Sequence, residues 1–531
     1  MTAIRRTITA PNMTPQSQPL NSRQVRNNAG GFVFEITADQ QLRRFLVLGT
    51  EGGTFYEKEN QITAKNIKVV DSLLATNPQA VYDALIWATD NAPRNEACLY
   101  TLAVMASGTP EARKLAKQAF SKVVRTGTHL FHFLGYLKLL GNRGWGRGLR
   151  TMVGSFYQKD AGQVAYSAIK YRSRDGWSQR DALRLSHVKP LTPAHAEVFN
   201  YITDKEVNLE VAPEVLKQAI AVRDGIGEGS VVEFAADGKL PWEAFGDNQR
   251  TPEFWRALLP SMPIGALVRN LSTMSRIGVL SAADTTESKT VVAKLTNAEA
   301  IRKSRIHPVQ LVDAMLVYQS GGQASTYGAA KAKPYAPNKA IVAALETAVT
   351  LAFKSLPDTG KRTLVAMDVS GSMQGGRVGG STLLTPAMGS AIMAVQHAKD
   401  AGSQFVAFST GLTKLDKSKF TTVNGALKHL SGRPFSGTDC AQPMLYAMEK
   451  GLDFDAFVVY TDNETWHGHV HPTEALRQYR IKSGINARLA VVGMTATSFS
   501  IADPSDIGML DVVGLSADSP QILVQFINGN I

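Results

Sequence analysis

Two hydrophobic patterns divide the chain. From about residue 61 to 320, apolar residues recur every three to four positions in segments such as "NIKVVDSLLA", "AVYDALIWATD" and "EARKLAKQAFSKVV", which is the spacing of amphipathic helices. Several of these segments are 10–15 residues long and are separated by Gly, Pro or Asn, which end helices. Many helices of similar length in succession predict stacked helix pairs in a solenoid, although no fixed-period sequence repeat accompanies them.

The pattern changes after residue 361. Short β-rich runs, "RTLVAMDVS", "QFVAFST", "AFVVYTD", "ARLAVVGMT" and "LDVVGLS", alternate with helical stretches such as "TPAMGSAIMAVQHAKDAG" and "TEALRQYRIKSG". This alternation predicts a parallel sheet with helices on both faces, a doubly wound α/β fold. Continuous apolar runs such as "FVVY" fit strands buried on both sides. The sequence therefore predicts an α + α/β protein with one helical and one α/β domain.

The joining segments set the predicted domain limits. The N-terminus is polar with scattered arginines and lacks the apolar core of a signal peptide, so we expect a flexible arm. "AKAKPYAPNKA" resembles a linker, and the helix "AIVAALETAVTLAFKSL" follows it and stops at Pro357. The predicted parts are an arm over 1–30, a helical domain over 31–335, a linker helix over 336–361 and an α/β domain over 362–531.

The composition indicates in which cellular compartment the protein is expected. No stretch approaches about 18 uninterrupted apolar residues, so no membrane-spanning helix and no membrane partner are expected. The two cysteines, Cys98 and Cys440, are far apart in the sequence. This argues against a disulfide scaffold or a thiolate zinc site and suits a reducing compartment, so we expect a cytoplasmic protein.

The positive charge is concentrated in one region. The chain has a net charge of +12; residues 111–190 hold 16 Lys and Arg against 4 Asp and Glu, whereas residues 361–531 hold 14 of each kind. A concentrated positive field attracts polyanions, and nucleic acid is the commonest of them. The alternative is a basic face that is merely solvated.

Within the basic region, residues 138–190 interleave eleven Lys and Arg with aromatic side chains. Cations neutralise phosphates and aromatic rings stack on unpaired bases, the usual targets of RNA recognition. On a helix, Lys170 and Arg174 would share a face while Arg172 would point elsewhere. The alternative is that most of the aromatics form the cores of helix pairs. The aromatics are Trp145, Phe156, Tyr157, Tyr166, Tyr171 and Trp177.

A second candidate site lies at strand ends of the α/β domain. Asp368 ends the first predicted strand, and Asp462 ends a later one. In such sheets, ligands bind beyond the carboxyl ends of the strands. Ser370 and Ser372 alternate in the loop after Asp368, and Thr438 lies in "FSGTDC". Two carboxylates, three hydroxyls and water make an all-oxygen shell that suits Mg²⁺, with one position left for a partner's carboxylate. The alternative is that the two serines only cap the next helix.

Other motifs are weaker. "TWHGHVHP" places three histidines at alternate positions, which invites a zinc site, but no carboxylate–histidine cluster accompanies it. "PDTGKRT" lacks the earlier glycine of a phosphate loop and precedes a strand instead of following one. Nuclease chemistry usually needs two metals about 3.5–4 Å apart in a denser acidic cluster. We therefore expect a non-enzyme.

The motifs of both regions resemble known families. "DVSGS" with a later Thr and Asp resembles the metal-ion-dependent adhesion site of von Willebrand factor A domains. "GWGRGLR", "IKYRSRDGWSQRDALRLSHVKP", "MPIGALVRNL" and "RIHPVQLVDAMLVYQSG" resemble the TROVE domain of the Ro autoantigen family. "SGTDCAQPML" and "TDNETWHGHVHP" resemble that family's version of the A domain. These blocks span most of the chain, and we identify it as a bacterial-type Ro protein.

The resemblance carries further expectations. It implies a ring of HEAT-like helix pairs closed by the A domain, small non-coding Y RNAs bound on the outer surface, and single-stranded 3′ ends of misfolded RNAs in the central hole. It also implies an exoribonuclease as a partner of bacterial members. It raises His187, which by itself would be a structural histidine, to a candidate RNA contact. The candidate RNA contacts are Lys138, Arg147, Arg150, Lys170, Arg172, Arg174, His187 and Lys189.

The leading hypothesis is a non-catalytic RNA-binding protein whose A domain captures an acidic protein ligand through Mg²⁺. One alternative is a metal-dependent adhesion or assembly module that binds protein instead of RNA, which the local charge disfavours. A metal-dependent nuclease is a third hypothesis, disfavoured by the sparse acidic cluster. A ring closed by its own domain would favour a monomer.

Overall fold

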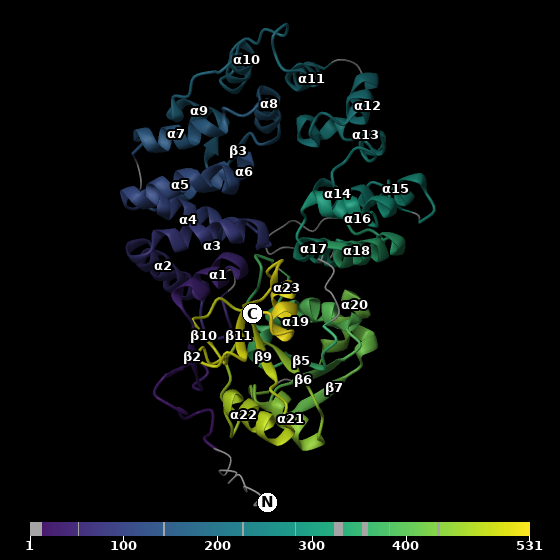
Figure 1. Cartoon of the computed structure of the whole chain (residues 1–531). Coiled ribbons are helices and arrows are strands. Elements are labelled where there is room, and N and C mark those ends of the chain that lie inside the picture. Colours follow the sequence, from purple (N-terminus) through teal and green to yellow (C-terminus); the bar gives the residue numbers. More distant parts are fainter. Residues whose placement is uncertain are drawn as a thin grey trace, which may run out of the picture. The chain divides into compact units, whose positions relative to one another are not determined.

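The computed structural model describes residues 13–50, 53–141, 144–225, 228–281, 283–322, 333–352, 359–381, 383–432 and 436–531 (Figure 1). The described residues form two compact units. One unit contains the residues up to Ile67 together with those from 359 onward, and the other contains the residues from Lys68 to 352.

The helical unit begins within α2 (Glu59–Thr76) and runs to α18 (Lys339–Ala352). One short hairpin interrupts the helices, formed by β3 (Ser173–Arg174) and β4 (Trp177–Ser178), and the 3₁₀ turns η1 (Trp242–Ala244) and η2 (Asp247–Gln249) follow later. The intervening helices are α3 (Pro78–Asn91), α4 (Glu96–Ser107), α5 (Pro110–Val123), α6 (Gly127–Leu139), α7 (Arg147–Phe156), α8 (Ala161–Lys170), α9 (Gln179–Ser186), α10 (Pro193–Ile202), α11 (Glu214–Arg223), α12 (Glu228–Asp237), α13 (Pro252–Leu258), α14 (Ile264–Arg276), α15 (Thr286–Leu295), α16 (Ala298–Ser304) and α17 (Pro308–Gln319).

Local sequence starts many of these helices. At α5, the side chain of Thr109 accepts a hydrogen bond from Ala112 N, and Pro110 occupies the first turn, where its missing N–H costs nothing. At α10, Thr192 and Pro193 repeat this arrangement. Capping therefore fixes the starts of these two helices.

Neighbouring helices of this unit pack in pairs and follow one another in a curved row (Figure 1). Between α5 and α6, the buried rings of Phe120 and Phe133 meet edge to face with centroids 5.4 Å apart, a favoured aromatic geometry. The row returns on itself, because Gln310 Nε2 on α17 donates to Pro93 O at 2.6 Å and Arg94 lies 3.8 Å from Asp313. The predicted solenoid of helix pairs is confirmed.

The predicted linker helix belongs to the helical unit. Helix α18 packs against α15, α16 and α17, and its face with Ile341, Leu345 and Val349 is fully buried. Because these apolar positions recur at helical spacing, the segment 339–352 completes the core of the unit instead of joining two domains. The final residues of the predicted helix, 353–356, lie outside the described residues.

The second unit contains a six-stranded sheet in the order β11-β9-β8-β5-β6-β7. All neighbours are parallel except β7, which pairs antiparallel with β6 at the edge. The predicted doubly wound domain and its five strands are confirmed. The strands are β5 (Thr363–Asp368), β6 (Ser403–Phe408), β7 (Leu412–Leu415), β8 (Ala456–Thr461), β9 (Arg488–Gly493) and β11 (Met509–Val513).

Helices cover both faces of this sheet. Alternate strand residues such as Leu364 and Val459 join a core with Met444 and Leu476 of α21 and α22, while α19 packs against β5 and β8, and α23 against β9 and β11. The helical elements are α19 (Pro386–Ala394), η4 (Val395–Lys399), η5 (Lys417–Thr421), α20 (Val423–Leu430), α21 (Gln442–Lys450), α22 (Pro472–Ser483) and α23 (Ser519–Ile527).

The N-terminal segment is part of the α/β unit, which corrects the predicted flexible arm for residues 13–30. Strands β1 (Gln24–Arg26), β2 (Phe32–Glu35) and β10 (Phe499–Ser500) form a small antiparallel sheet. Inside α1 (Ala38–Leu48), fully buried Arg44 pairs with Asp511 and donates to Phe499 O at 2.9 Å. These backbone and ion-pair contacts come from residues far along the chain, so local composition did not reveal them.

The predicted limits therefore differ from the compact units, because residues 31–67 belong to the same compact unit as the α/β domain. Both cysteines are free and buried, one in each unit. Among the helices of the described ranges, none has the length and hydropathy needed to cross a membrane.

Candidate metal site and nucleic-acid interface

The first site lies where the strand order reverses. Strand β5 has β6 on one side and β8 on the other, and Asp368 ends β5 with its side chain fully buried. Its Oδ1 accepts from Ser370 N at 2.8 Å, and its Oδ2 accepts from Thr461 Oγ1 at 2.7 Å. The carboxylate is thus fixed at the switch point, the usual ligand position of such sheets.

Ser370 and Ser372 turn their hydroxyls toward the same place. Ser370 precedes the 3₁₀ turn η3 (Gly371–Gln374), yet among the described residues its side chain makes no cap hydrogen bond. Its Oγ lies 3.1 Å from Ser372 Oγ instead, and the Ser372 hydroxyl bonds the Asp462 carboxylate. Capping alone therefore does not account for the two serines.

Asp462 and Thr438 complete the predicted set. Asp462 follows β8, is buried, and accepts from Glu464 N at 3.1 Å through Oδ1. Thr438 is buried in the loop before α21, and its carbonyl accepts from Trp466 N and His467 N, both at 3.0 Å. That loop also runs beside the serine loop, since Gly371 N donates to Ser436 O at 3.5 Å. The structure thus gathers all five predicted residues in one region.

The electrostatics of the site fit a cation. Burial, and then the neighbouring Asp462 carboxylate, raise the pKa of Asp368, and burial raises the pKa of Asp462. Two acids that destabilise each other's charge in a buried site are stabilised by a positive ion. Two carboxylates with hydroxyl oxygens around them are donors for a hard cation such as Mg²⁺, so the residues fit the expected metal.

Sequence reasoning missed the contribution of the N-terminal segment to this site. Buried Glu464 accepts from Asn28 Nδ2 at 2.7 Å and from Ala29 N at 3.0 Å. Burial, and then the Asp462 charge, raise the pKa of Glu464. The signal available in the sequence was that Glu464 stands two residues after Asp462, because alternate residues of an extended chain point to the same side.

A second missed segment is residues 53–56. Gly376 has φ +70, and a Cβ on it would strike the carbonyl oxygen of Gly53, while a Cβ on Gly375 would come within 3.0 Å of Phe55 Cα. Glycine is needed for this close approach. The neighbouring Tyr56 lies within electrostatic range of the site. Its burial, and then the charges of Asp462, Glu464 and Asp368, raise the pKa of its phenol to about 12.

One of the three alternating histidines, His471, packs against the N-terminal segment. His471 is buried, its Nε2 is 2.8 Å from Gln18 O, and its Nδ1 is 3.3 Å from Gln24 Nε2. Both ring nitrogens of His471 are therefore engaged by the N-terminal segment, which gives this histidine a structural role.

The eight candidate RNA residues lie on consecutive elements of the helical unit. Seven of the side chains are exposed, and Lys170 is half-buried. Within the described part of the chain, none has a carboxylate within ion-pair distance, although ion pairs are present elsewhere in the unit, as at Arg256. They lie on α6 (Lys138), on α7 (Arg147, Arg150), at the end of α8 (Lys170), just before β3 and in it (Arg172, Arg174), and just after α9 (His187, Lys189).

The structure corrects the expected shared helix face of Lys170 and Arg174. Helix α8 ends at Lys170, and Arg174 lies in strand β3. The Lys170 ammonium is 5.6 Å from the Tyr166 ring centroid and 5.5 Å from that of Tyr171, a cation–π arrangement. Burial lowers its pKa, with opposing influences from Glu243 and Arg269. Tyr171 and the "RSRDG" turn end the helix earlier than the spacing suggested.

The aromatics of the block divide between core and surface. Phe156 and Tyr157 are buried in the helix pairs, as the structural interpretation expected. Trp145 and Trp177 are only half-buried, with ring centroids 6.2 Å apart, and Tyr166 and Tyr171 are half-buried beside Lys170. Four of the six rings thus keep exposed surface next to the cations, as stacking on bases requires.

His187 ends α9 in a left-handed conformation with φ 53, which is uncommon for residues other than glycine. Its backbone N–H donates to Arg184 O at 3.3 Å, and its side chain is exposed. The backbone turn thus projects the imidazole outward, next to Lys189.

Sequence reasoning missed Arg269, whose charge reaches Lys170 from α14. Arg269 lies in the quoted block "MPIGALVRNL", which was the available signal.

Comparison with known proteins defines the class. Residues 25–218 and 241–325 match the TROVE domain family, and residues 362–527 match the Ro60 vWA domain family. The chain is thus a TROVE protein with a Ro-type A domain. It belongs to the Ro60 family, and the sequence-based identification of a bacterial-type Ro protein is confirmed.

Individual relatives cover nearly the whole chain. The RNA-binding protein RO60 of Deinococcus radiodurans is 39% identical over 530 residues, covering 97% of this chain and 98% of that protein. The RNA-binding protein RO60 of Caenorhabditis elegans is 31% identical over 612 residues, covering 97% and 92%. The crystal structure of the Deinococcus radiodurans RO (RSR) protein matches with a TM-score of 0.68 and 37% identity, covering 93% of this chain and 100% of that chain.

Proposed function

We propose that this chain is a non-catalytic RNA-binding protein of the Ro type. Its helical unit binds small non-coding Y-like RNA on the basic face and takes single-stranded 3′ ends of misfolded RNA into the central hole that the family implies. The function served is RNA quality control or processing in the cytoplasm, with an exoribonuclease as a partner.

One observation carries this proposal: eight cationic or histidine side chains on consecutive elements lack a carboxylate partner within ion-pair distance in the described ranges, and half-exposed aromatic rings lie among them. A cation without an internal partner does not have to break an ion pair before it binds a phosphate. When it binds, it releases counterions from the nucleic acid. RNA-binding relatives of matching length support the same function.

The A domain has a separate role in this proposal. Asp368, Asp462 and the hydroxyls of Ser370, Ser372 and Thr438 hold Mg²⁺, which supplies a Lewis-acidic coordination position for a carboxylate of an acidic protein ligand. The burial of both aspartates and the orientation of the serine hydroxyls support this. The proposal assigns one ion to the carboxylates of Asp368 and Asp462, with Glu464 at the edge of the site, whereas two-metal hydrolysis usually uses a denser acidic cluster.

The test is RNA binding by the purified chain across a range of salt concentrations. A stem with a single-stranded 3′ tail competes against the same stem with blunt ends. We expect the tailed RNA to bind more tightly, and the logarithm of affinity to fall linearly with the logarithm of salt concentration, by about one unit per phosphate contact. Equal affinities would argue against capture of 3′ ends, and an affinity insensitive to salt would contradict the basic face as the binding surface.

A further inference from the structure

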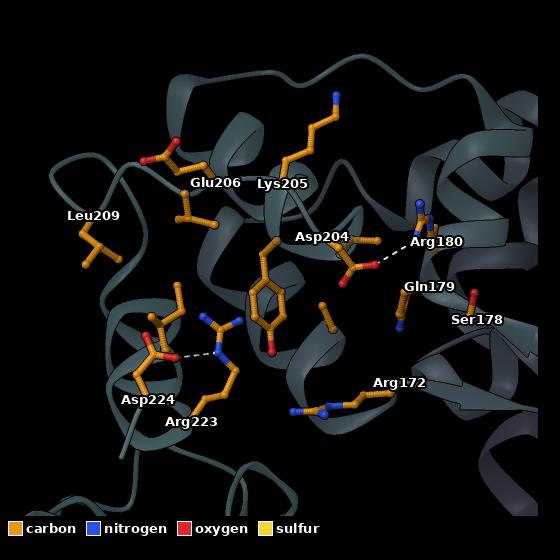
Figure 2. A pocket seen from close by; sticks show the side chains of 15 residues that line it. Arg172, Ser178, Gln179, Arg180, Asp204, Lys205, Glu206, Leu209, Arg223 and Asp224 are labelled. Carbon is orange, nitrogen blue, oxygen red and sulfur yellow. Dashed lines mark hydrogen bonds and ion pairs between the residues drawn. The ribbon is translucent and has the colours of Figure 1, made fainter. Parts of the chain in front are cut away.

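A cavity of about 870 Å³ opens in the helical unit beside the basic face. It lies between the end of α8, the corner from β4 into α9, the end of α10, the connection from α10 to α11, and α11 itself. Its volume is in the range of roughly 300–1,000 Å³ that small-molecule ligands occupy. Figure 2 shows the side chains of Arg172, Arg180 and Arg223 arranged around this space.

The three arginines around the cavity differ in whether a carboxylate of the chain already pairs with them. Arg180 Nη1 is 2.7 Å from Asp204 Oδ2, and Arg223 Nε is 2.9 Å from Asp224 Oδ1. Arg172 is exposed, and within the described ranges its guanidinium has no hydrogen-bond or ion-pair partner. The cavity therefore offers one guanidinium ready for a phosphate, and two others that are held in place and keep further N–H donors.

The rest of the lining is apolar and aromatic. Tyr201 is half-buried at the end of α10, Ile202 and Ile220 are buried, and Leu209 keeps 47% of its surface exposed at the rim. Leu209 extends the apolar lining formed by Ile202 and Ile220 to the rim of the cavity. A phenol ring with aliphatic neighbours offers a face on which a planar base packs.

The mixed charge argues for one nucleotide over a longer polyanion. Asp204 and Asp224 each direct one oxygen to an arginine, and their other oxygens stay available at an exposed rim. Carboxylate oxygens accept hydrogen bonds from the amino groups of bases but repel closely spaced phosphates. The arrangement thus suits a base with its single phosphate.

We propose that this cavity receives an unpaired nucleotide extruded from the bound RNA, its base on Tyr201 and the aliphatic wall and its phosphate at Arg172. This proposal rests on the proposed function, because Arg172 belongs both to the basic face and to the cavity. Lys170 packs on its own tyrosines at the C-terminus of α8, while Arg172, two residues on, lines the cavity. A strand crossing the hairpin thus meets the cavity at that residue.

The experiment compares Tyr201→Ala, Tyr201→Phe and wild type in titrations with a short single-stranded oligoribonucleotide at several salt concentrations. Tyr201→Ala should weaken binding about tenfold, because one stacked base is lost, and should leave the salt slope unchanged, because no phosphate contact is removed. Tyr201→Phe keeps the ring and should bind like the wild type. Tyr82→Ala removes another half-buried tyrosine, on α3, and should leave affinity unchanged.

A second variant guards against misfolding. Leu209→Ser changes an exposed side chain, so the fold should persist by circular dichroism, and binding should weaken severalfold if a base covers the rim. Wild-type affinity in both Tyr201→Ala and Leu209→Ser, while the wild-type chain binds RNA with a steep salt slope, would overturn the nucleotide site and leave the proposed function intact. That outcome would favour a protein ligand for the cavity. Failure of the wild-type chain to bind RNA would overturn both proposals.

Discussion

Asn28 donates from Nδ2 to Oε1 of Glu464 at 2.7 Å, across 436 positions of sequence. Glu464 stands two residues after Asp462, and its other oxygen accepts from Ala29 N. The N-terminal segment therefore holds a buried acid at the edge of the candidate metal site. This contact explains why residues far outside the predicted α/β domain belong to its compact unit.

Asn28→Ala should destabilise the α/β unit by about 1–3 kcal/mol, because the buried side chain of Glu464 loses a hydrogen-bond donor. The midpoint of its thermal unfolding should fall by several degrees in calorimetry. Asn530→Ala is the matched control, since its amide bonds Gln525 at an exposed position and its loss should shift the midpoint little. Equal shifts in both variants would show that Asn28 does not support Glu464.

Asp368→Ala and Asp462→Ala should each abolish or greatly weaken Mg²⁺ binding, because a site with two carboxylates cannot spare one. RNA affinity should persist, because the basic residues act through their own charges. Calorimetric titration with Mg²⁺ and, separately, with RNA checks both expectations. Asp453→Ala, which changes an exposed acid near Arg362, should retain both activities. Parallel loss of metal and RNA binding in folded variants would mean that the two sites are coupled.

His397 should make the α/β unit sensitive to acid. Its Nε2 lies 2.9 Å from Tyr460 Oη in the core, and burial lowers its pKa to about 4. An unfolded histidine titrates near 6.5. The folded state therefore excludes a proton that the unfolded state binds, so this contribution is present above about pH 6.5 and is lost as the pH falls toward 4.

The test of this prediction is thermal unfolding of wild type and His397→Gln between pH 7 and 5. Glutamine can keep a hydrogen bond to Tyr460 but has no proton to gain. The wild type should lose about 2 kcal/mol more than the variant over this interval, from about 1.4 kcal/mol per pH unit below 6.5. Carboxylates common to both chains cancel in the difference. Identical pH dependence would exclude His397 as a cause.

Purified protein with Mg²⁺ should neither shorten RNA nor hydrolyse ATP, because the candidate site holds two carboxylates and not a two-metal cluster, and "PDTGKRT" lacks the pattern of a phosphate loop. Gel analysis of labelled RNA and a phosphate-release assay measure this. RNA cleavage that co-purifies with the chain and disappears in Asp368→Ala would contradict the proposed non-catalytic role.

Most of the fold was readable from the sequence because the two hydrophobic periods differ so clearly. Strands such as "AFVVYT" are buried on both faces, so each can be recognised from its own continuous apolar run. Strand β7, "LTKL", lies at the sheet edge with a largely exposed, polar face, so it has no such pattern. Strand β10 has only two residues, and its partner β2 lies more than 460 positions earlier, beyond the reach of local patterns.

The candidate sites were predictable where their residues follow a motif. Asp368, Ser370 and Ser372 are local, and Asp462 ends a recognisable strand. The contributions of Asn28, Tyr56 and Arg269 depend on tertiary contacts and have no local signal of comparable strength. The helical spacing also predicted a wrong position for Arg174. The turn after Lys170 ends helix α8, so Arg174 lies in β3 and does not share a helix face with Lys170.

The most direct test of the central claim is the salt dependence of RNA affinity in the double variant Lys170→Ala with Arg174→Ala. Arg256→Ala with Lys303→Ala removes the same charge from residues that are ion-paired internally, and is the matched control. We predict weaker binding and a salt slope reduced by about two units in the first variant, since each phosphate contact contributes about one unit, and near-wild-type behaviour in the control. An unchanged slope and affinity in the first variant, or equal losses in both, would contradict RNA binding by this face.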